Sequence, residues 1–151
     1  MYQKTLVCLD GSSLAEQILP YATEVALCCG SRIVLLEVTI PPSALVEPLT
    51  GYYHATPLDK ILREEEEARI YLNRVAQRLR KKGVKVSCVT MPGDPGETIV
   101  SYASENAVDL VALSTHGRSG LGRLAFGSVA DFVLKRVGVP ILLRKPQETK
   151  E

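Results

Sequence analysis

The sequence lacks the features that mark several classes of protein. Its 18 lysines and arginines nearly balance 17 aspartates and glutamates, so the formal net charge is +1 and gives no electrostatic case for nucleic acid or an anionic membrane as a partner. No apolar run approaches the length that spans a bilayer. The first ten residues, M-Y-Q-K-T-L-V-C-L-D, lack the long apolar region of a secretory signal. The expected location is therefore the cytoplasm.

Cysteine and histidine are also too few for a metal or disulfide framework. The four cysteines show no C-x-x-C spacing, and the two histidines, His54 and His116, lie far apart in the chain. Each cysteine falls in an apolar strand-like run or near the end of a helical pattern. We therefore expect four buried free thiols in a reducing compartment. They are Cys8, Cys28, Cys29 and Cys88.

Apolar strand patterns alternate with helical patterns along all 151 residues. Strands are predicted over Lys4–Leu9, Arg32–Thr39, Val84–Thr90, Val108–Leu113 and Val139–Arg144. Helices are predicted over Leu14–Cys29, Leu58–Lys82, Asp94–Asn106 and Ser128–Val137. Such alternation predicts a parallel sheet covered on both faces, which is a single doubly wound, Rossmann-like α/β domain over residues 1–146. Residues 147–151 form a polar tail.

Several local signals define the ends and faces of these helices. Pro20 interrupts the first helical pattern and predicts either a kink there or a helix with an irregular first turn. Asp94 is expected to cap a helix that begins at Pro95, and Ser128 is expected to cap the last one. The acidic run from Glu64 to Glu67 is interpreted as the solvated outer face of a surface helix rather than as a metal cluster. Leu62 is assigned to the buried apolar stripe of that helix, and Glu65 and Arg69 are spaced for pairing one turn apart.

Two stretches fall between the regular elements. Residues 40–57, rich in proline, are interpreted as a variable surface loop. The stretch from Leu110 to Ser128 passes from an apolar strand into a loop of glycine, hydroxyl and arginine residues and then into a helix. That order presents backbone amides to a phosphate, although a flexible glycine turn is the simpler alternative. If the first and fourth strands are neighbours, this loop and Asp10 face the same crevice.

The glycine loop matches neither the P-loop nor the dinucleotide fingerprint, but it resembles the universal stress proteins. Their nucleotide-binding members carry a glycine, two residues, a glycine, nine residues, and then a glycine with a small hydroxyl residue. Gly117, Gly127 and Ser128 fit this spacing, and Ser114 stands where the pattern has its first glycine. The resemblance extends to V-C-L-D-G-S, L-L-E-V, M-P-G-D-P and V-P-I-L-L-R, and so spans nearly the whole chain.

The resemblance implies a five-stranded open sheet of order 3-2-1-4-5 and a site for ATP, or for AMP or ADP, with Mg²⁺ accompanying the triphosphate. Asp10 would meet the ribose or a metal-bound water, Cys8 would lie by the adenine, and Val38 would offer main-chain groups to the adenine edge. Arg118 is added as a phosphate partner because of its charge and place. The predicted nucleotide-binding residues are Cys8, Asp10, Val38, Leu113, Ser114, His116, Gly117, Arg118, Gly127, Ser128 and Val129.

The family also implies a homodimer in which the last strand, from Val139 to Leu143, pairs with its copy. The predicted function is an ATP-binding stress-response or signalling module with at most slow hydrolysis. One alternative is a true ATPase or phosphotransferase that uses His116 or Asp10. Another is an interaction protein of the same fold that binds no nucleotide, because Ser114 closes the site.

Overall fold

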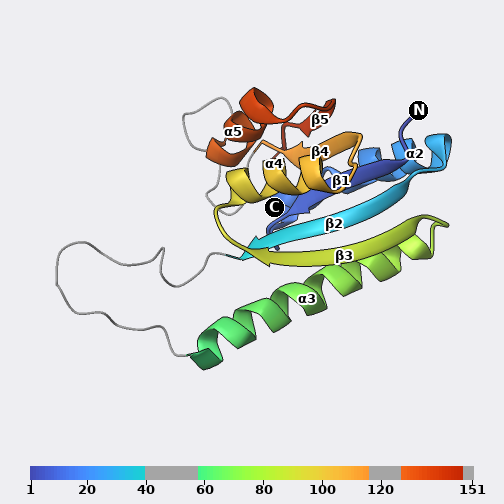
Figure 1. The fold of residues 1–151 in the computed structure, drawn as a ribbon. Helices are drawn as coiled ribbons and strands as arrows, with labels where there is room; N and C mark the ends of the chain where they lie inside the picture. Colours follow the sequence, from blue (N-terminus) through green and yellow to red (C-terminus); the bar gives the residue numbers. More distant parts are fainter. Residues whose placement is uncertain (40–57, 116–126, 148–151) are drawn as a thin grey trace.

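The apolar runs of the sequence form a parallel sheet whose strand order is β3-β2-β1-β4-β5, as the resemblance implied. The computed structural model describes residues 1–39, 58–115 and 127–147 (Figure 1). The predicted loop at 40–57 lies outside the described residues. The elements are β1 (Lys4–Leu9), α1 (Ser13–Glu16), α2 (Leu19–Cys29), β2 (Arg32–Thr39), α3 (Leu58–Arg80), β3 (Lys85–Pro92), α4 (Pro95–Glu105), β4 (Leu110–Ser114), α5 (Ser128–Arg136) and β5 (Ile141–Arg144).

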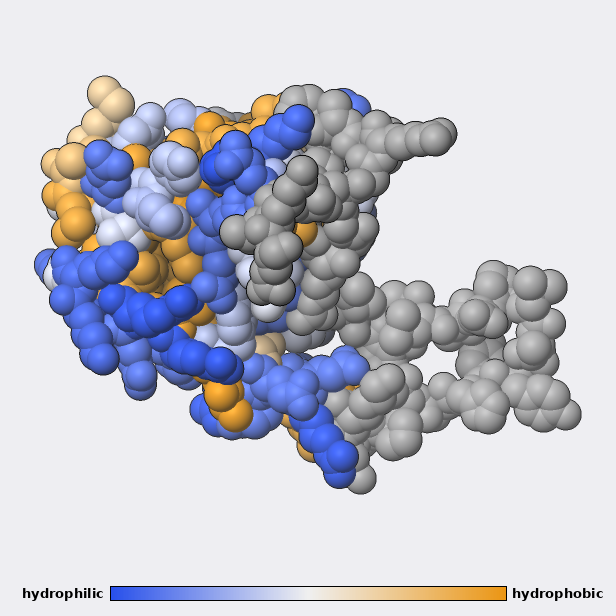
Figure 2. All heavy atoms as spheres, turned by 180° about the vertical axis from the view of Figure 1, so that it is seen from behind, coloured by the Kyte–Doolittle hydropathy of each residue, from blue (hydrophilic) through white to orange (hydrophobic). Residues whose placement is uncertain are grey.

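One face of the molecule carries mostly hydrophilic side chains (Figure 2). Figure 2 shows polar and charged side chains over much of one face, with smaller apolar groups between them. The large apolar side chains that are about half exposed are scattered over three helices: Tyr21, Leu27, Leu62, Ile70 and Leu134. Within the described ranges, no helix combines the length and the apolar character needed to cross a membrane.

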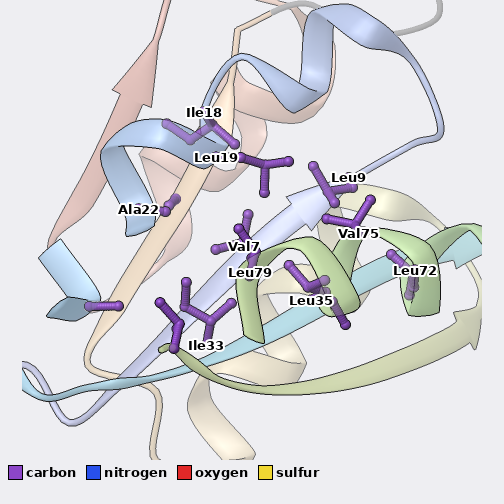
Figure 3. Close-up of a cluster of buried hydrophobic side chains, with 14 of the residues drawn as sticks. Val7, Leu9, Ile18, Leu19, Ala22, Ile33, Leu35, Leu72, Val75 and Leu79 are labelled. Carbon is purple, nitrogen blue, oxygen red and sulfur yellow. The ribbon is translucent and has the colours of Figure 1, made fainter. Parts of the chain in front are cut away.

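Helices cover both faces of the sheet, as the alternation predicted, and each face has its own core. On one face, Val7, Ile33 and Leu35 of the sheet pack against residues of α1, α2 and α3, including Leu72 and Val75 (Figure 3). On the other face, the intervening strand residues pack against α4 and α5. Side chains alternate across a strand, so the same short runs supply both cores.

Three helix ends bear on the sequence predictions. The first helical pattern is divided into two helices, α1 and α2, so neither a kink nor one helix with an irregular first turn is found. Pro20 lies in the first turn of α2, where its missing N–H breaks no intrahelical hydrogen bond. Asp94 caps α4 as expected, because its carboxylate accepts from the Glu97 amide at 2.9 Å. The prediction for Ser128 is wrong: Gly127 is the cap residue, with extended backbone, and Ser128 is already helical.

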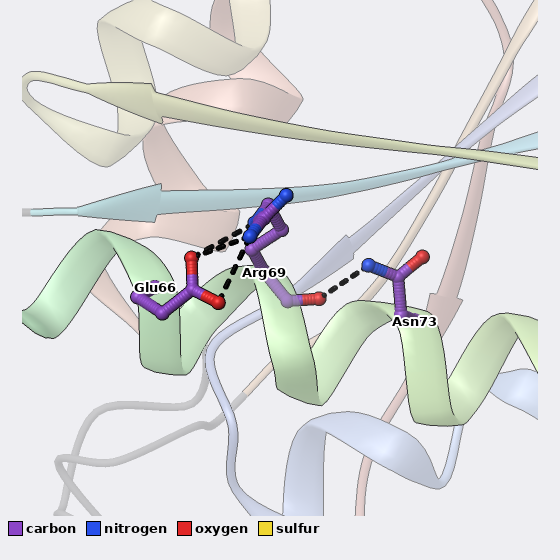
Figure 4. Close-up of polar contacts among 3 residues, drawn as sticks. All are labelled: Glu66, Arg69 and Asn73. Atoms are coloured by element: carbon purple, nitrogen blue, oxygen red, sulfur yellow. Dashed lines mark hydrogen bonds and ion pairs between the residues drawn. The ribbon is translucent and has the colours of Figure 1, made fainter.

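The long helix α3 differs from its predicted pattern at its exposed face. Leu62, assigned to the buried stripe, is 53% exposed. Arg69 binds Glu66, one turn away, rather than Glu65, and Asn73 donates to the Arg69 carbonyl (Figure 4). Both partners of this ion pair face solvent, so it adds little to the stability of the fold.

The expectation of four buried thiols is wrong for two of them. Cys8 is buried in β1, and Cys88 is half-buried in β3. Cys28 and Cys29 are exposed, because they lie in the last turn of α2, beyond Ala26, the last buried residue of that helix. All four cysteines are free.

These environments predict a strong contrast in thiol reactivity. Burial raises the pKa of Cys8 to about 12, so this thiol stays protonated near neutral pH, whereas a thiolate is needed for alkylation. Iodoacetamide added to the folded protein should therefore modify Cys28 and Cys29 first and Cys8 only after denaturation. Peptide mass spectrometry over a time course measures the order. Labelling of Cys8 as fast as that of Cys28 would contradict the structure.

The contact between α4 and α5 predicts a second result. A Cβ atom at Gly96 would lie 2.7 Å from Cδ1 of Phe132, and 2.8 Å from its Cγ, so the ring must shift to admit even a methyl group. We expect Gly96→Ala to lower the free energy of unfolding by about 1–3 kcal/mol. Gly138→Ala is the matched control, because no atom lies within 4 Å of its added Cβ. Urea unfolding followed by circular dichroism tests both, and equal stability of the two variants would show that this contact is not tight.

Candidate functional site

A cavity of about 750 Å³ opens at the carboxyl ends of the central strands. β1 pairs in parallel with both β2 and β4, so the strand order reverses between β1 and β4. The first and fourth strands are thus neighbours, as the sequence argument required. In doubly wound sheets, ligands bind in a crevice at the point of reversal, because the crossover helices on its two sides run away from it in opposite directions.

The turn from β1 to α1 fixes Asp10 at the cavity wall. Its Oδ1 accepts hydrogen bonds from the amide and the hydroxyl of Ser12, at 3.0 and 2.6 Å. The Ser12 hydroxyl in turn accepts from the amide of Ala15 and caps α1. Gly11 between them has φ +80°, which a residue with a side chain rarely adopts. The sequence D-G-S therefore builds a rigid turn that presents the Asp10 carboxylate.

The end of β4 brings the start of α5 to the same cavity. The Thr115 amide donates to the carbonyl of Arg144 at 2.9 Å, and the Thr115 carbonyl accepts from the amide of Gly127 at 2.7 Å. Gly127, Ser128 and Val129 consequently line the cavity at the N-terminus of α5. The first amides of a helix lack intrahelical acceptors and carry partial positive charge, so this end of the cavity suits an anion.

Ser114, the departure from the family fingerprint, fits without strain. Among the described residues other than glycine, only Ala107 has a positive φ, so the Ser114 backbone does not need glycine. Its hydroxyl donates to the carbonyl of Ala15 in α1 at 3.2 Å. The side chain that serine has and glycine lacks thus joins β4 to α1 through this hydrogen bond.

The cavity has an apolar wall on the side of α4 and α5. Residues of the core beneath these helices line it: Cys8, Leu36, Val38, Ile99 and Leu113. The high pKa of Cys8 keeps this thiol neutral, so the wall carries no charge there. When a flat apolar group such as a purine ring packs against this wall, water leaves both the wall and the face of the ring that contacts it.

The opposite wall, on the side of α3, is acidic. Glu37 of β2 and Glu64, Glu67 and Tyr71 of α3 line it beside Asp10. Glu67 is exposed, as predicted for the solvated acidic run of α3, whereas Glu64 is half-buried at this wall. Residues 64, 67 and 71 share one helix face at spacings of three and four. That face turns toward the carboxyl end of the sheet.

The Tyr71 phenol remains protonated at this wall. Burial raises the pKa of Tyr71, and the negative charges of Glu16, Glu37 and Asp10 raise it further. The carboxylates are not arranged as a metal centre: within the described ranges, no three His, Cys, Asp or Glu side chains are grouped to hold an ion. The wall therefore offers carboxylate acceptors to an organic ligand.

The structure brings most of the predicted site residues together at this cavity. Those that line it are Cys8, Asp10, Val38, Leu113, Ser114, Gly127, Ser128 and Val129. His116, Gly117 and Arg118 lie outside the described residues. Sequence reasoning missed Glu37 and Tyr71, and one signal was available: Glu37 interrupts an otherwise apolar strand, R-I-V-L-L-E-V-T.

Known proteins share this architecture along the whole chain. Universal stress protein MJ0531 of Methanocaldococcus jannaschii is 28% identical over 150 residues, which are 98% of this chain and 85% of that protein. The solved structure of MJ0577, from the same organism, superposes with a TM-score of 0.82 at 26% identity and covers 99% of both chains.

Two solved structures with this fold contain adenine nucleotides. One is a universal stress protein in complex with cAMP, with a TM-score of 0.65, 23% identity and coverage of 97% of this chain and 98% of that one. The other is an Arabidopsis thaliana universal stress protein family member with AMP bound, with a TM-score of 0.67, 17% identity and coverage of 96% and 92%. At these identities the likeness establishes the fold alone.

The family model described as the universal stress protein family matches residues 1–145. The match takes in the turn at Asp10, the strand that carries Glu37 and Val38, and the start of α5. The chain therefore belongs to the universal stress protein family.

Proposed function

We propose that this protein binds ATP, or its products ADP and AMP, in the cavity at the carboxyl ends of β1, β2 and β4. It would act as a nucleotide-dependent stress-response or signalling module. The observation that carries the proposal is the pairing of an anion-accepting helix start, at Gly127 and Ser128, with an apolar wall around Val38 in one cavity. The cAMP and AMP found in two family structures support it.

The strand order supports one orientation of the nucleotide. Neighbouring strands are about 4.8 Å apart, so the ends of β4, β1 and β2 lie along a line of about 10 Å. A nucleotide has phosphate, ribose and base in the same linear order. Phosphates beside Ser128, at the end of β4, thus put the ribose near Asp10 of β1 and the base near Val38 of β2.

The loop residues His116, Gly117 and Arg118 complete the phosphate end in this proposal, on the basis of the family fingerprint alone. Mg²⁺ would be held mainly by the triphosphate and by water, with the Asp10 carboxylate available to a metal-bound water. We propose that any hydrolysis of ATP by this protein is slow. An ATPase that uses His116 or Asp10 is the alternative.

The main prediction concerns the backbone at Gly127. Isothermal titration calorimetry should detect ATP binding to the purified protein, and Gly127→Val should weaken it by about tenfold or more, because the side chain would occupy the approach to the helix amides. Gly127 has φ −61°, so valine can adopt its backbone conformation. Gly138→Val, at a site with open space around it, is the control.

The outcomes of this experiment separate the candidate functions. If neither ATP nor AMP binds at millimolar concentration, the remaining candidate function is an interaction protein that binds no nucleotide. Binding that Gly127→Val does not change refutes the phosphate role of Gly127. Turnover at enzyme-like rates that is lost in His116→Ala, with binding retained, favours the ATPase or phosphotransferase.

We also propose that the protein forms a homodimer through β5, the strand that the resemblance to the family indicates for pairing. β5 ends the strand order and pairs only with β4 among the described strands. All four of its residues, Ile141–Arg144, are partly exposed. Val139, just before the strand, packs at the margin of the core beneath α4 and α5. An apolar edge of this kind favours pairing with another strand.

Light scattering after size exclusion tests the dimer. We expect a mass near twice the 16.5 kDa of one chain, and we expect Val139→Lys to shift it toward the monomer, because two like charges would meet across a twofold axis. Leu27→Lys on the exposed face of α2 should leave the mass unchanged. A wild-type protein that stays monomeric at about 100 μM, well above the Kd expected of a stable dimer, would refute the proposal.

A further inference from the structure

Residues 145–147, which follow β5, form a segment that we call the C-terminal strap. Resting on the proposed function, we infer that the strap holds both polar ends of the nucleotide site in place, so that strap docking and nucleotide binding stabilise each other. One polar end is the Asp10 carboxylate, and the other is the start of α5 at Gly127. None of the three strap residues lines the cavity, so the strap acts through the elements that do.

The strap docks at the junction of α1 and α2. Gln17, the residue that ends α1, uses both polar atoms of its side chain: Nε2 donates to the Gln147 carbonyl at 2.8 Å, and Oε1 accepts from the Gln147 amide at 2.9 Å. This is the reciprocal exchange of bonds that joins neighbouring residues in an antiparallel sheet. Pro146, one residue earlier, is buried. Packing and hydrogen bonds therefore both hold the strap.

The helix α1 connects this contact to Asp10. It has only four residues, a length at which helical hydrogen bonds do not offset the entropy lost in ordering the turn, so its position depends on what holds its ends. At its start, the Ser12 hydroxyl both caps the helix and donates to Asp10. At its end, Gln17 binds the strap. A docked strap therefore steadies the turn that presents the Asp10 carboxylate.

The start of α5 is reached through the residue that precedes the strap. The carbonyl of Arg144 accepts from the Thr115 amide at 2.9 Å, and the Thr115 carbonyl accepts from the Gly127 amide at 2.7 Å. The guanidinium carbon of Arg144 also lies 5.6 Å from the centre of the Tyr21 ring in α2. Residues 144–147 thus contact the supports of both polar ends of the cavity.

Other contacts of α1 limit the size of the effect. Ser114 donates to the Ala15 carbonyl at 3.2 Å, and Arg78 of α3 donates to the Glu16 carboxylate at 2.6 Å. The Arg78 side chain is 54% exposed, so that ion pair is weak. Loss of the strap should therefore loosen the Asp10 turn without unfolding it, and the affinity for nucleotide should fall by a factor rather than vanish.

Linkage makes the coupling reciprocal. If a docked strap raises the affinity for nucleotide by a given factor, bound nucleotide must favour the docked strap by the same factor. Release of the strap then lowers nucleotide affinity without any change to a residue of the cavity.

Amide hydrogen exchange followed by nuclear magnetic resonance tests the coupling in the wild-type protein, because the Gln147 amide reports on strap docking through its bond to Gln17. We expect saturating ATP to slow exchange of this amide by about threefold or more. We expect Gln17→Ala, which removes both bonds, to weaken ATP binding in calorimetry by a similar factor, about threefold or more.

Two further variants separate the strap from general effects on the fold. Pro146→Gly removes the buried ring and loosens the chain without changing α1, so it should weaken ATP binding as Gln17→Ala does. Gln77→Ala is the matched control, because Gln77 is an exposed residue of α3 that does not line the cavity, and it should leave affinity and exchange unchanged. The wild-type exchange experiment needs no variant.

The failures are distinguishable. If ATP binds and exchange of the Gln147 amide does not respond to it, the strap is not coupled to the site and the inference is overturned, while the proposed function stands. Wild-type affinity in both Gln17→Ala and Pro146→Gly overturns the inference in the same way. If no nucleotide binds at millimolar concentration, the proposed function itself fails and the inference fails with it.

Discussion

The position of β1 at the centre of the sheet is the constraint on which the rest of the structure depends. This strand makes parallel ladders on both edges, with β2 and with β4, and its residues Leu6 and Val7 have no exposed surface. Parallel neighbours need crossover connections, and the connection after β1 runs to β2, whereas the connection after β4 runs in the opposite direction along the sheet, to β5. The crevice at its carboxyl end is thus a geometric result of the chain path, and every residue that follows a central strand is delivered to it.

Alternation along the strands then gives this crevice two chemically different walls. Residues of β2 on one face continue the apolar core beneath α4 and α5, and residues on the other face meet α3. A single strand end can therefore offer an apolar surface through Val38 and a carboxylate through Glu37. An asymmetric ligand with a flat apolar body and polar edges suits such a pair of walls better than a simple anion does.

The sequence predicted the strands well, because they depend on local patterns, and most of the residues predicted for the site line one cavity. The run at Arg32–Thr39 was located to the residue, and the Asp94 cap follows from a short-range hydrogen bond that D-P-G-E encodes. Other features depend on packing between distant segments and could not be predicted this way. The contribution of Glu67 to a cavity wall requires knowing how α3 lies against the sheet, and the exposure of Cys29 requires knowing where the core beneath α2 ends.

The bond between Ser114 and Ala15 has a consequence for how family signatures are written. A glycine in a fingerprint records either a backbone conformation that other residues avoid or a lack of room for a side chain. At the end of β4 the conformation is ordinary, and the neighbouring helix turn supplies a carbonyl that receives a hydroxyl. The requirement at this point is for a small side chain with a local acceptor. Signatures that insist on glycine here would discard chains that keep the same pocket by different means.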